Sequence, residues 1–142
     1  MKYNWKHFTL KEMTNSETAS KFNIDNTPDK YVVSNLDKLV TNVLDPIRES
    51  WGKPIKVTSG YRCFLLNKIV GGVKTSQHMS GKAADIQPID YKDIDKFIIF
   101  VKNWCESNEF DQCIIERSKT TKWIHISFDD GRNRKKVFSL TK

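Results

Sequence analysis

The segment "KWIHISF", Lys122–Phe128, decides the expected fold because its apolar residues occupy alternate positions. This alternation is typical of a β-strand with one face against a core, since successive side chains point to opposite faces. The two expected faces are Ile124, Ile126 and Phe128 toward the core, and Trp123, His125 and Ser127 toward the outside. The outer face, with a ring, an imidazole and a hydroxyl, is typical of a strand that lines a cleft.

Other segments of the chain indicate further strands and two long helices. Strand-like runs are "PIKVTSGYR" (54–62), "AADIQP" (83–88), "FDQCIIE" (110–116) and "KKVFSL" (135–140). Apolar residues at three- and four-residue steps predict helices over 31–51 and 91–107. Late strands joined by short polar connections favour an α+β fold with a mainly antiparallel central sheet and flanking helices.

Three local signals refine this prediction. Pro46 interrupts the first helix, so we expect a kink or a restart near Asp45. Gly52 is expected to end that helix. Residues 67–75, which contain Gly71 and Gly72, are expected to form a flexible loop.

Length and composition favour one domain, residues 1–142, that buries a core without a disulfide framework. The three cysteines are odd in number and contain no Cys-x-x-Cys pair, so we interpret them as small core residues in a reducing compartment. Met1–Met13 lacks the apolar run of a secretory signal, and no window is long enough to span a membrane. The expected place of synthesis is therefore the cytoplasm, with no membrane partner.

The net charge of +7 and the sequence pI of about 9.3 favour an anionic partner. Nucleic acid, a membrane surface and an acidic polymer such as a cell wall all fit this charge. The densest basic run, residues 132–136, is interpreted as a solvated turn. No recognisable nucleic-acid-binding motif accompanies it, so nucleic acid is not an expected partner.

A second segment, "SQHMSGKAADI" (76–86), raises the possibility of a metal site. His78, Asp85 and His125 together offer two imidazoles and one carboxylate, which is a common ligand set of catalytic zinc. Such a site would have a net charge of +1 and would acidify bound water to a pKa of about 7. Gly81 would permit the turn that brings the ligands together. Spacing alone leaves open that these histidines are ordinary core or surface residues.

The order of several motifs extends this interpretation. These are "SGYR" (59–62), Asn67, Gly71–Gly72, "SQHMSGKAADI" and "WIHIS" (123–127). In this order they resemble the zinc D-Ala-D-Ala carboxypeptidase family of peptidases, and the chain is most similar to its small single-domain members. The likeness covers nearly the whole chain and is weakest at the C-terminal tail. It implies a hedgehog/D,D-peptidase-like fold with a zinc site in a cleft on the sheet.

The resemblance also implies roles for individual residues. One zinc ion would be held by His78, Asp85 and His125. Arg62, at the end of "SGYR", would hold the substrate or polarise its carbonyl; a strand-end salt bridge is the alternative. Ser76 would bind either the substrate or the loop backbone.

The general base needs a separate argument. Several branches of the family carry Asp or Glu three residues before the last histidine, where this chain has Lys122. Glu116 is the nearest replacement, because the hairpin register can place it diagonally across from His125, about 7 Å away. The alternative for Glu116 is an ion pair with Lys122 or Arg117.

Two supporting residues and one outlier complete the candidate set. Asp111 and Gln112 are candidates to support the site, for example by bonding the free N–H of a ligand imidazole. His7 lies outside the motifs and is expected at the surface.

The expected function is that of a zinc metallopeptidase that hydrolyses amide bonds in the stem peptides of bacterial peptidoglycan. It would be a D,D-carboxypeptidase or an endopeptidase, similar to a phage endolysin, and would reach the anionic cell wall after release by lysis. We expect a monomer. The alternative is a non-catalytic, zinc-containing module of the same fold that binds the wall or has a structural role. A basic nucleic-acid-binding domain is a third interpretation, which would require a contiguous basic face with aromatic platforms.

Overall fold

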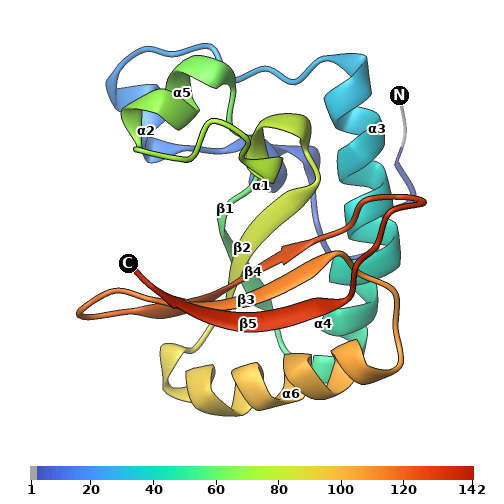
Figure 1. Cartoon of the computed structure of the whole chain (residues 1–142). Helices are drawn as coiled ribbons and strands as arrows, with labels where there is room; N and C mark the ends of the chain where they lie inside the picture. Colours follow the sequence, from blue (N-terminus) through green and yellow to red (C-terminus); the bar gives the residue numbers. More distant parts are fainter. Residues whose placement is uncertain (1–2) are drawn as a thin grey trace.

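The alternating segments form one five-stranded sheet in the computed structural model, which describes residues 3–142 (Figure 1). Its strands are β1 (Ile55–Ser59), β2 (Ala83–Pro88), β3 (Gln112–Arg117), β4 (Lys122–Ser127) and β5 (Lys136–Thr141). Their order across the sheet is β1-β2-β4-β3-β5, and only the β3–β5 pair is parallel. The expected α+β fold with a mainly antiparallel sheet is therefore confirmed.

The two faces of β4 are confirmed for Ile124, Ile126 and His125, but Ser127, expected toward the outside, is fully buried and accepts a hydrogen bond from the Gln112 N–H. Ile124 and Ile126 are fully buried and belong to the hydrophobic core. His125 is paired in register with Asp85 of β2 on one side and with Ile114 of β3 on the other. We call the face of the sheet that carries Asp85, His125 and Glu116 the cleft face.

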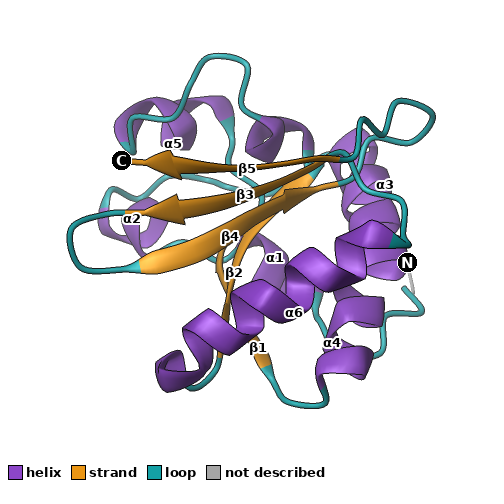
Figure 2. Cartoon of the chain, turned by 60° about the horizontal axis from the view of Figure 1, so that its bottom comes forward, coloured by secondary structure: helices purple, strands orange, loops and turns teal. Residues whose placement is uncertain are grey.

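The opposite face of the sheet packs against the longer helices. These are α3 (Lys30–Leu39), α4 (Asp45–Trp51) and α6 (Ile94–Glu106). In Figure 2, α6 crosses in front of the sheet, and it contacts β2, β3 and β4. A short 3₁₀ turn, η3 (Tyr91–Asp93), precedes α6, so the helix predicted from Tyr91 begins with a tighter first turn. These helices contribute buried side chains such as Leu36, Ile47 and Phe97 to one core with the sheet.

The helix predicted over residues 31–51 contains the expected irregularity before Pro46. A π-helical segment, η1 (Val40–Leu44), follows α3, and α4 restarts at Asp45. Pro46 has no N–H, and its ring would clash with a carbonyl one turn earlier in a regular α-helix, so the wider turn accommodates it. Gly52 follows the last helical residue, as predicted.

Three short helices lie outside the layer of α3, α4 and α6, although Met13 of the first one is part of the core. They are α1 (Leu10–Thr14), α2 (Glu17–Lys21) and α5 (Phe64–Ile69), and α2 and α5 lie at the top left of Figure 1. Side chains of Thr9, Ser16 and Cys63 accept a hydrogen bond from the first turn of α1, α2 and α5, respectively. Each helix therefore begins at a residue able to satisfy a free backbone N–H.

The loop predicted over residues 67–75 was wrong at its start, because Asn67 belongs to α5. This helix is six residues long, and Phe64 and Leu65 on it are exposed, so its apolar residues show no buried stripe in the sequence. Asn67 is buried and donates a hydrogen bond to the carbonyl of Val73, which ties the following turn to the helix.

Two cysteines have the core positions expected of them. Cys105 and Cys113 are buried, and the hydrogen bond with Cys105 together with burial raises the pKa of the Cys113 thiol far above its usual range. Cys63 is only partly buried. Within residues 3–142, every helix is too short or too polar to cross a bilayer; residues 1 and 2 of the Met1–Met13 segment lie outside the described part.

Candidate metal centre

His78 is placed by a short turn with a specific start and end. The 3₁₀ turn η2 (Gln77–Ser80) begins after Ser76, whose hydroxyl accepts a hydrogen bond from the His78 N–H. Gly81 ends the turn with a φ of 75°, and a Cβ there would lie 2.7 Å from the carbonyl oxygen of Val32. A side chain at this position would meet both backbone strain and a steric clash, so glycine is required, as the sequence predicted.

The imidazole of His78 is oriented by the main chain. Its Nδ1 lies 2.7 Å from the carbonyl oxygen of Gly60, to which it donates a hydrogen bond in the tautomer that leaves Nε2 free. A Cβ on Gly60 would lie 2.2 Å from the carbonyl oxygen of Met13, so this close approach also depends on glycine. The free Nε2 of His78 lies 3.2 Å from Oδ1 of Asp85.

Sheet register brings the other two candidate ligands together. Asp85 and His125 are directly opposed on β2 and β4, and His125 Nδ1 lies 3.3 Å from Asp85 Oδ1. Ligand atoms of His78, Asp85 and His125 all lie within 4.8 Å of one another. Bonds of about 2.0–2.1 Å in a tetrahedral site separate neighbouring ligand atoms by about 3.3 Å. The triad therefore fits one metal ion, and zinc suits its donor set.

The electrostatics of the triad keep its carboxylate ionised. Burial of Asp85 opposes ionisation, but electrostatic attraction by the neighbouring imidazoles of His78 and His125 outweighs it. The result is a pKa of Asp85 far below its usual value. An ionised carboxylate beside two imidazoles is the state that a cation requires.

Glu116 faces the same cleft. It is paired in register with Trp123, so it lies on the cleft face diagonally across from His125. Its Oε1 is 3.9 Å from His125 Nδ1, and its Oε2 is 3.0 Å from Nζ of Lys142. The alternative pairing with Lys122 or Arg117 is therefore wrong, because Glu116 is buried and its ion-pair partner comes from the end of β5.

The residue three positions before His125 points elsewhere. The Lys122 ammonium is 2.8 Å from Asp95 Oδ1 on α6. This contact draws the lysine away from the triad, toward the helical side of the sheet.

Arg62 lies beside the triad without an ion pair among residues 3–142. Its Nε is buried and has no hydrogen-bond partner in this described part of the chain. Burial lowers the pKa of Arg62, and the nearby carboxylates of Asp85 and Glu116 partly offset that effect. A desolvated, unpaired guanidinium is suited to bind a carboxylate or a developing oxyanion.

Asp111 supports the site through the loop and not through an imidazole. The carboxylate accepts a hydrogen bond of 2.7 Å from Gln77, the neighbour of His78, and binds Arg134 through both oxygens at 2.8 Å. The basic run at 132–136 is therefore more than a solvated turn, since Arg134 anchors it to a buried acid. Gln112 lines the cleft near the triad.

The remaining histidine lies outside the group. Nε2 of His7 is 3.5 Å from Oε1 of Glu49, and the triad contains only the other two histidines.

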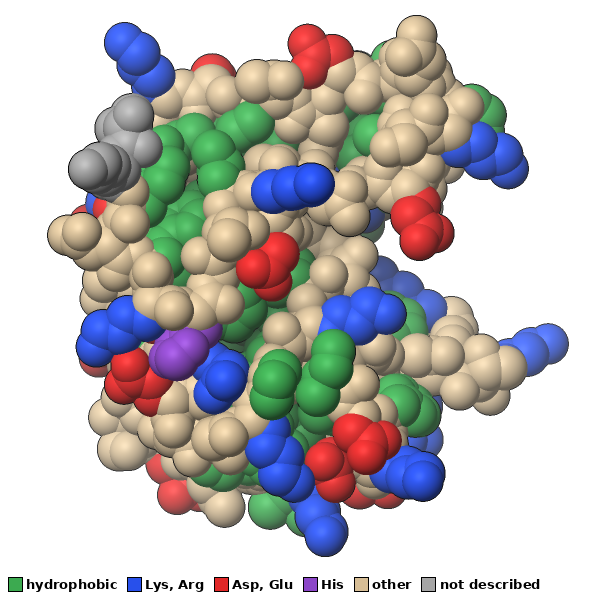
Figure 3. Space-filling view, turned by 180° about the vertical axis from the view of Figure 1, so that it is seen from behind, with side chains coloured by type: hydrophobic (Ala, Val, Ile, Leu, Met, Phe, Trp, Pro, Cys, Tyr) green, Lys and Arg blue, Asp and Glu red, His purple; other side chains and the backbone are tan. Residues whose placement is uncertain are grey.

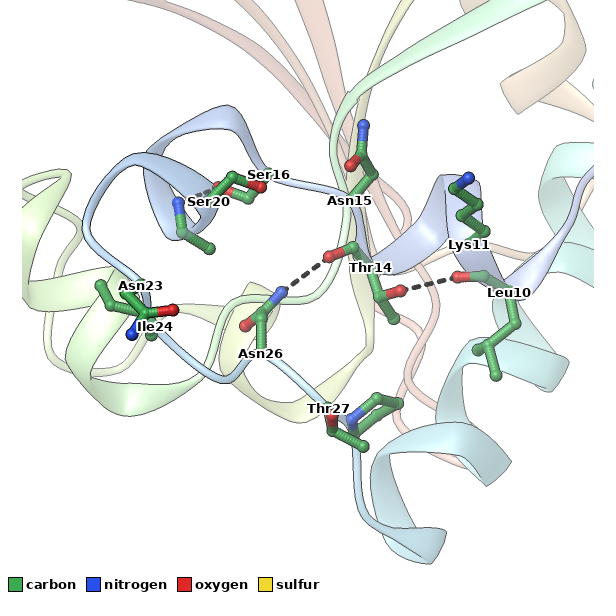
Figure 4. A pocket seen from close by; sticks show the side chains of 12 residues that line it. Leu10, Lys11, Thr14, Asn15, Ser16, Ser20, Asn23, Ile24, Asn26 and Thr27 are labelled. Carbon is green, nitrogen blue, oxygen red and sulfur yellow. Dashed lines mark hydrogen bonds between the residues drawn. The ribbon is translucent and has the colours of Figure 1, made fainter.

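Asn26 is a supporting residue that the sequence did not single out. Its side-chain amide donates to the carbonyl of Thr14 (Figure 4). The same amide donates to the carbonyl of Tyr61, and the side-chain oxygen accepts from the N–H of Cys63. These bonds hold the main chain on both sides of Arg62. No short motif in the sequence marks this role, because the partners lie 12 to 37 residues away.

Comparison with known proteins agrees with this geometry. A sequence model of a family described as Peptidase M15 matches residues 6–127, which contain the whole triad. No curated protein matches the chain closely enough to be counted as a relative. The chain therefore belongs to peptidase family M15, the D-Ala-D-Ala carboxypeptidase family of metallopeptidases.

Proposed function

We propose that this chain is a zinc-dependent peptidase that hydrolyses amide bonds in the peptides of bacterial peptidoglycan. The observation that carries the proposal is that the Glu116 carboxylate and the Arg62 guanidinium, which has no ion-pair partner within residues 3–142, lie beside a metal-binding triad. Glu116 is 3.9 Å from His125, and Arg62 lies next to Asp85 in the same cleft.

The residues of the site have three separate roles in the proposed hydrolysis. Zinc, when bound by His78, Asp85 and His125, supplies a Lewis acid that makes water more acidic and polarises a carbonyl group. Glu116 accepts a proton from the attacking water and passes it to the leaving amine, which is general acid–base catalysis. Arg62 donates hydrogen bonds to negative charge on the substrate or on the developing oxyanion.

The choice of substrate rests on likeness and charge. The motifs around the triad resemble those of enzymes that act on D-Ala-D-Ala peptides, and the net charge of +7 favours an anionic polymer. On the face seen in Figure 3, Lys and Arg side chains are interspersed with Asp and Glu. We propose that the positive excess attracts the chain to the wall and that the cleft selects the peptide. Ser76, which caps the His78 turn and lines the cleft, is the proposed additional substrate contact.

The alternative is a zinc-containing module that binds the wall without hydrolysis. It would need no carboxylate aimed at the metal group. The orientation of Glu116 toward His125 favours the enzyme over the module.

The proposal is tested with purified wild-type protein and three variants: His78→Ala, Glu116→Gln and the exposed control Glu109→Gln. Each is assayed for bound zinc and for new amino groups released from purified peptidoglycan. We expect His78→Ala to lose zinc and activity. Glu116→Gln should keep zinc and lose at least about 100-fold in kcat, while Glu109→Gln matches wild type. Peptidoglycan bound but never cleaved by zinc-loaded wild type would identify the module instead.

A further inference from the structure

The cleft continues on both sides of the metal triad. Two cavities, of about 500 and 610 Å³, share Arg62, Val70 and Asp85 in their walls. One extends over β1 and the start of α2, and the other over β4, β3 and β5. Figure 3 shows an indentation in outline between the part of the molecule with α2 and α5 and the β3–β4 hairpin. The background is visible in this indentation, so the groove is open from the front to the back of the molecule in this view.

Strand order places the triad inside this groove and not at its end. Asp85 is on β2 and His125 on β4, with β1 on one side of them and β3 and β5 on the other. Strands about 4.8 Å apart give the five-stranded floor a width of roughly 19 Å. An extended peptide rises about 3.3 Å per residue, so about six residues would cross the floor.

We call the cavity over β1 the β1 arm of the groove and the cavity over β4, β3 and β5 the β3/β5 arm. The side chains that line the two arms differ in polarity. The β1 arm is polar, with Ser16, Lys56 and Thr58 in its wall. In the β3/β5 arm, apolar side chains stand beside the catalytic groups. Leu140 is paired in register with Glu116 and is 45% exposed, and Val73 on the opposite rim is 67% exposed.

We propose that the enzyme is an endopeptidase, which binds an extended peptide across the groove and cuts it at an internal bond. This inference rests on the proposed function. A carboxypeptidase binds a terminal carboxylate directly beyond the bond that it cuts, which requires the groove to end there. Arg62 belongs to the walls of both cavities, so the groove continues on both sides of it.

The hydrolysis has two peptide products. Water adds across the C–N bond: its oxygen goes to the carbonyl carbon, and the proton taken by Glu116 goes to the amine. A new carboxyl terminus and a new amino terminus leave by opposite arms. The proposal therefore predicts that both fragments contain at least two residues.

Part of this groove comes from outside the family match. The matched residues end at 127, whereas β5 and Lys142 follow them. Of the apolar side chains of this arm, Leu140 therefore lies beyond the family match, whereas Val73 lies within it.

The test uses the zinc-loaded protein and three peptidoglycan peptides. They are a stem pentapeptide with a free carboxyl terminus, the same peptide as its C-terminal carboxamide, and a cross-linked stem dimer. Mass spectrometry identifies the products. We expect fragments of two or more residues on each side of the cut, and less than a threefold change in kcat/KM on amidation.

Release of a single C-terminal residue only, with more than a 100-fold loss on amidation, would overturn the inference and leave the proposed function intact. If none of the three peptides is hydrolysed, the proposed function fails and the inference fails with it.

Variants that fill each arm give a second readout. Thr58→Trp narrows the β1 arm and Leu140→Trp the β3/β5 arm, and Val137→Trp places the same ring on the opposite face of β5. Both arm variants should raise KM for the dimer about tenfold, and the control should leave it unchanged. An unchanged KM in either arm variant would show that peptide occupies one arm only.

Discussion

Asn26 holds the segment that presents Arg62, although neither it nor its partners stand near the triad in the sequence. Its amide bridges the carbonyl of Tyr61 and the N–H of Cys63, at 3.0 and 2.8 Å. The Arg62 N–H in turn donates to the carbonyl of His78. Arg62 and the metal ligand His78 are therefore positioned by one hydrogen-bonded unit.

Replacing Asn26 tests this unit. Asn26→Ala leaves the main chain beside Arg62 without its partners, so we expect kcat/KM to fall about tenfold, which corresponds to roughly 1.4 kcal/mol. Zinc content should remain at the wild-type level. The matched control is Asn103→Ala, an exposed amide on α6. Equal kcat/KM values for Asn26→Ala and the control would show that Arg62 needs no such support.

Lys142 has a similar supporting position next to Glu116. Its ammonium is 3.0 Å from Oε2, which leaves Oε1 directed toward His125. Removing the ammonium in Lys142→Met frees the carboxylate to rotate, so kcat should fall about threefold to tenfold with zinc content unchanged. Lys136→Met, at the other end of β5, is the control. Equal kcat values for the two variants would show that Lys142 does not position the Glu116 carboxylate.

At this scale the sequence was informative where the residue type carries the chemistry. His78, Asp85 and His125 could be recognised because few side chains bind zinc, and the register confirms that they meet. Asn26 and Lys142 could not be recognised, since an amide or an ammonium acquires such a role only from long-range contacts.

At the scale of elements, the Asp111 cluster joins three segments around the site. Asp111 precedes β3, Gln77 belongs to η2, and Arg134 precedes β5. The hydrogen bonds from Arg134 outweigh the effect of burial and lower the pKa of Asp111 to about 2. The ionised form of Asp111 therefore stabilises the folded protein.

This cluster predicts a pH-dependent stability. Because the folded pKa of Asp111 lies below the unfolded value of about 3.9, its contribution is complete above about pH 4. The contribution disappears as the pH falls toward 2. Asp111→Asn should lower the free energy of unfolding by about 1–2 kcal/mol at pH 7, and by about half of that at pH 3. Urea denaturation of both proteins at the two pH values measures this. A difference that does not change between pH 7 and pH 3 would contradict it.

Long elements were predictable and short ones were not. The helices that carry the core show an apolar stripe, and β4 shows strict alternation. Helix α5 has six residues and exposes Phe64 and Leu65, so its pattern does not resemble that of a buried helix. The parallel pairing of β5 with β3 could not be predicted either. The alternating pattern of a strand shows which face is buried, but it does not show which strand is its neighbour or in which direction the two run.

At the scale of the whole molecule, the two faces of the sheet have different roles, one in the hydrophobic core and one in the candidate site. One face packs against α3, α4 and α6, and the other carries the triad and the groove. The α+β class followed from the order of helical and strand patterns, whereas the open groove depends on strand order and on α2 and α5, which no local pattern reports.

Metal binding should stabilise the whole fold, since the triad joins η2, β2 and β4. Zinc at 100 times its Kd adds about 2.7 kcal/mol to stability, which corresponds to a rise in Tm of roughly 5–10 °C for a chain of this length. His78→Ala should lose this rise, and His7→Ala should retain it. Thermal unfolding with and without zinc measures both, and an equal rise in the two variants would place the metal elsewhere.

The most direct test of the central claim is zinc-dependent peptide hydrolysis by the wild-type protein. Chelator-treated protein is titrated with zinc, and new amino groups released from purified peptidoglycan are counted at each step. The account predicts no release without metal and a plateau at one zinc per chain. Release that is independent of zinc, or no release at full zinc occupancy, would contradict it.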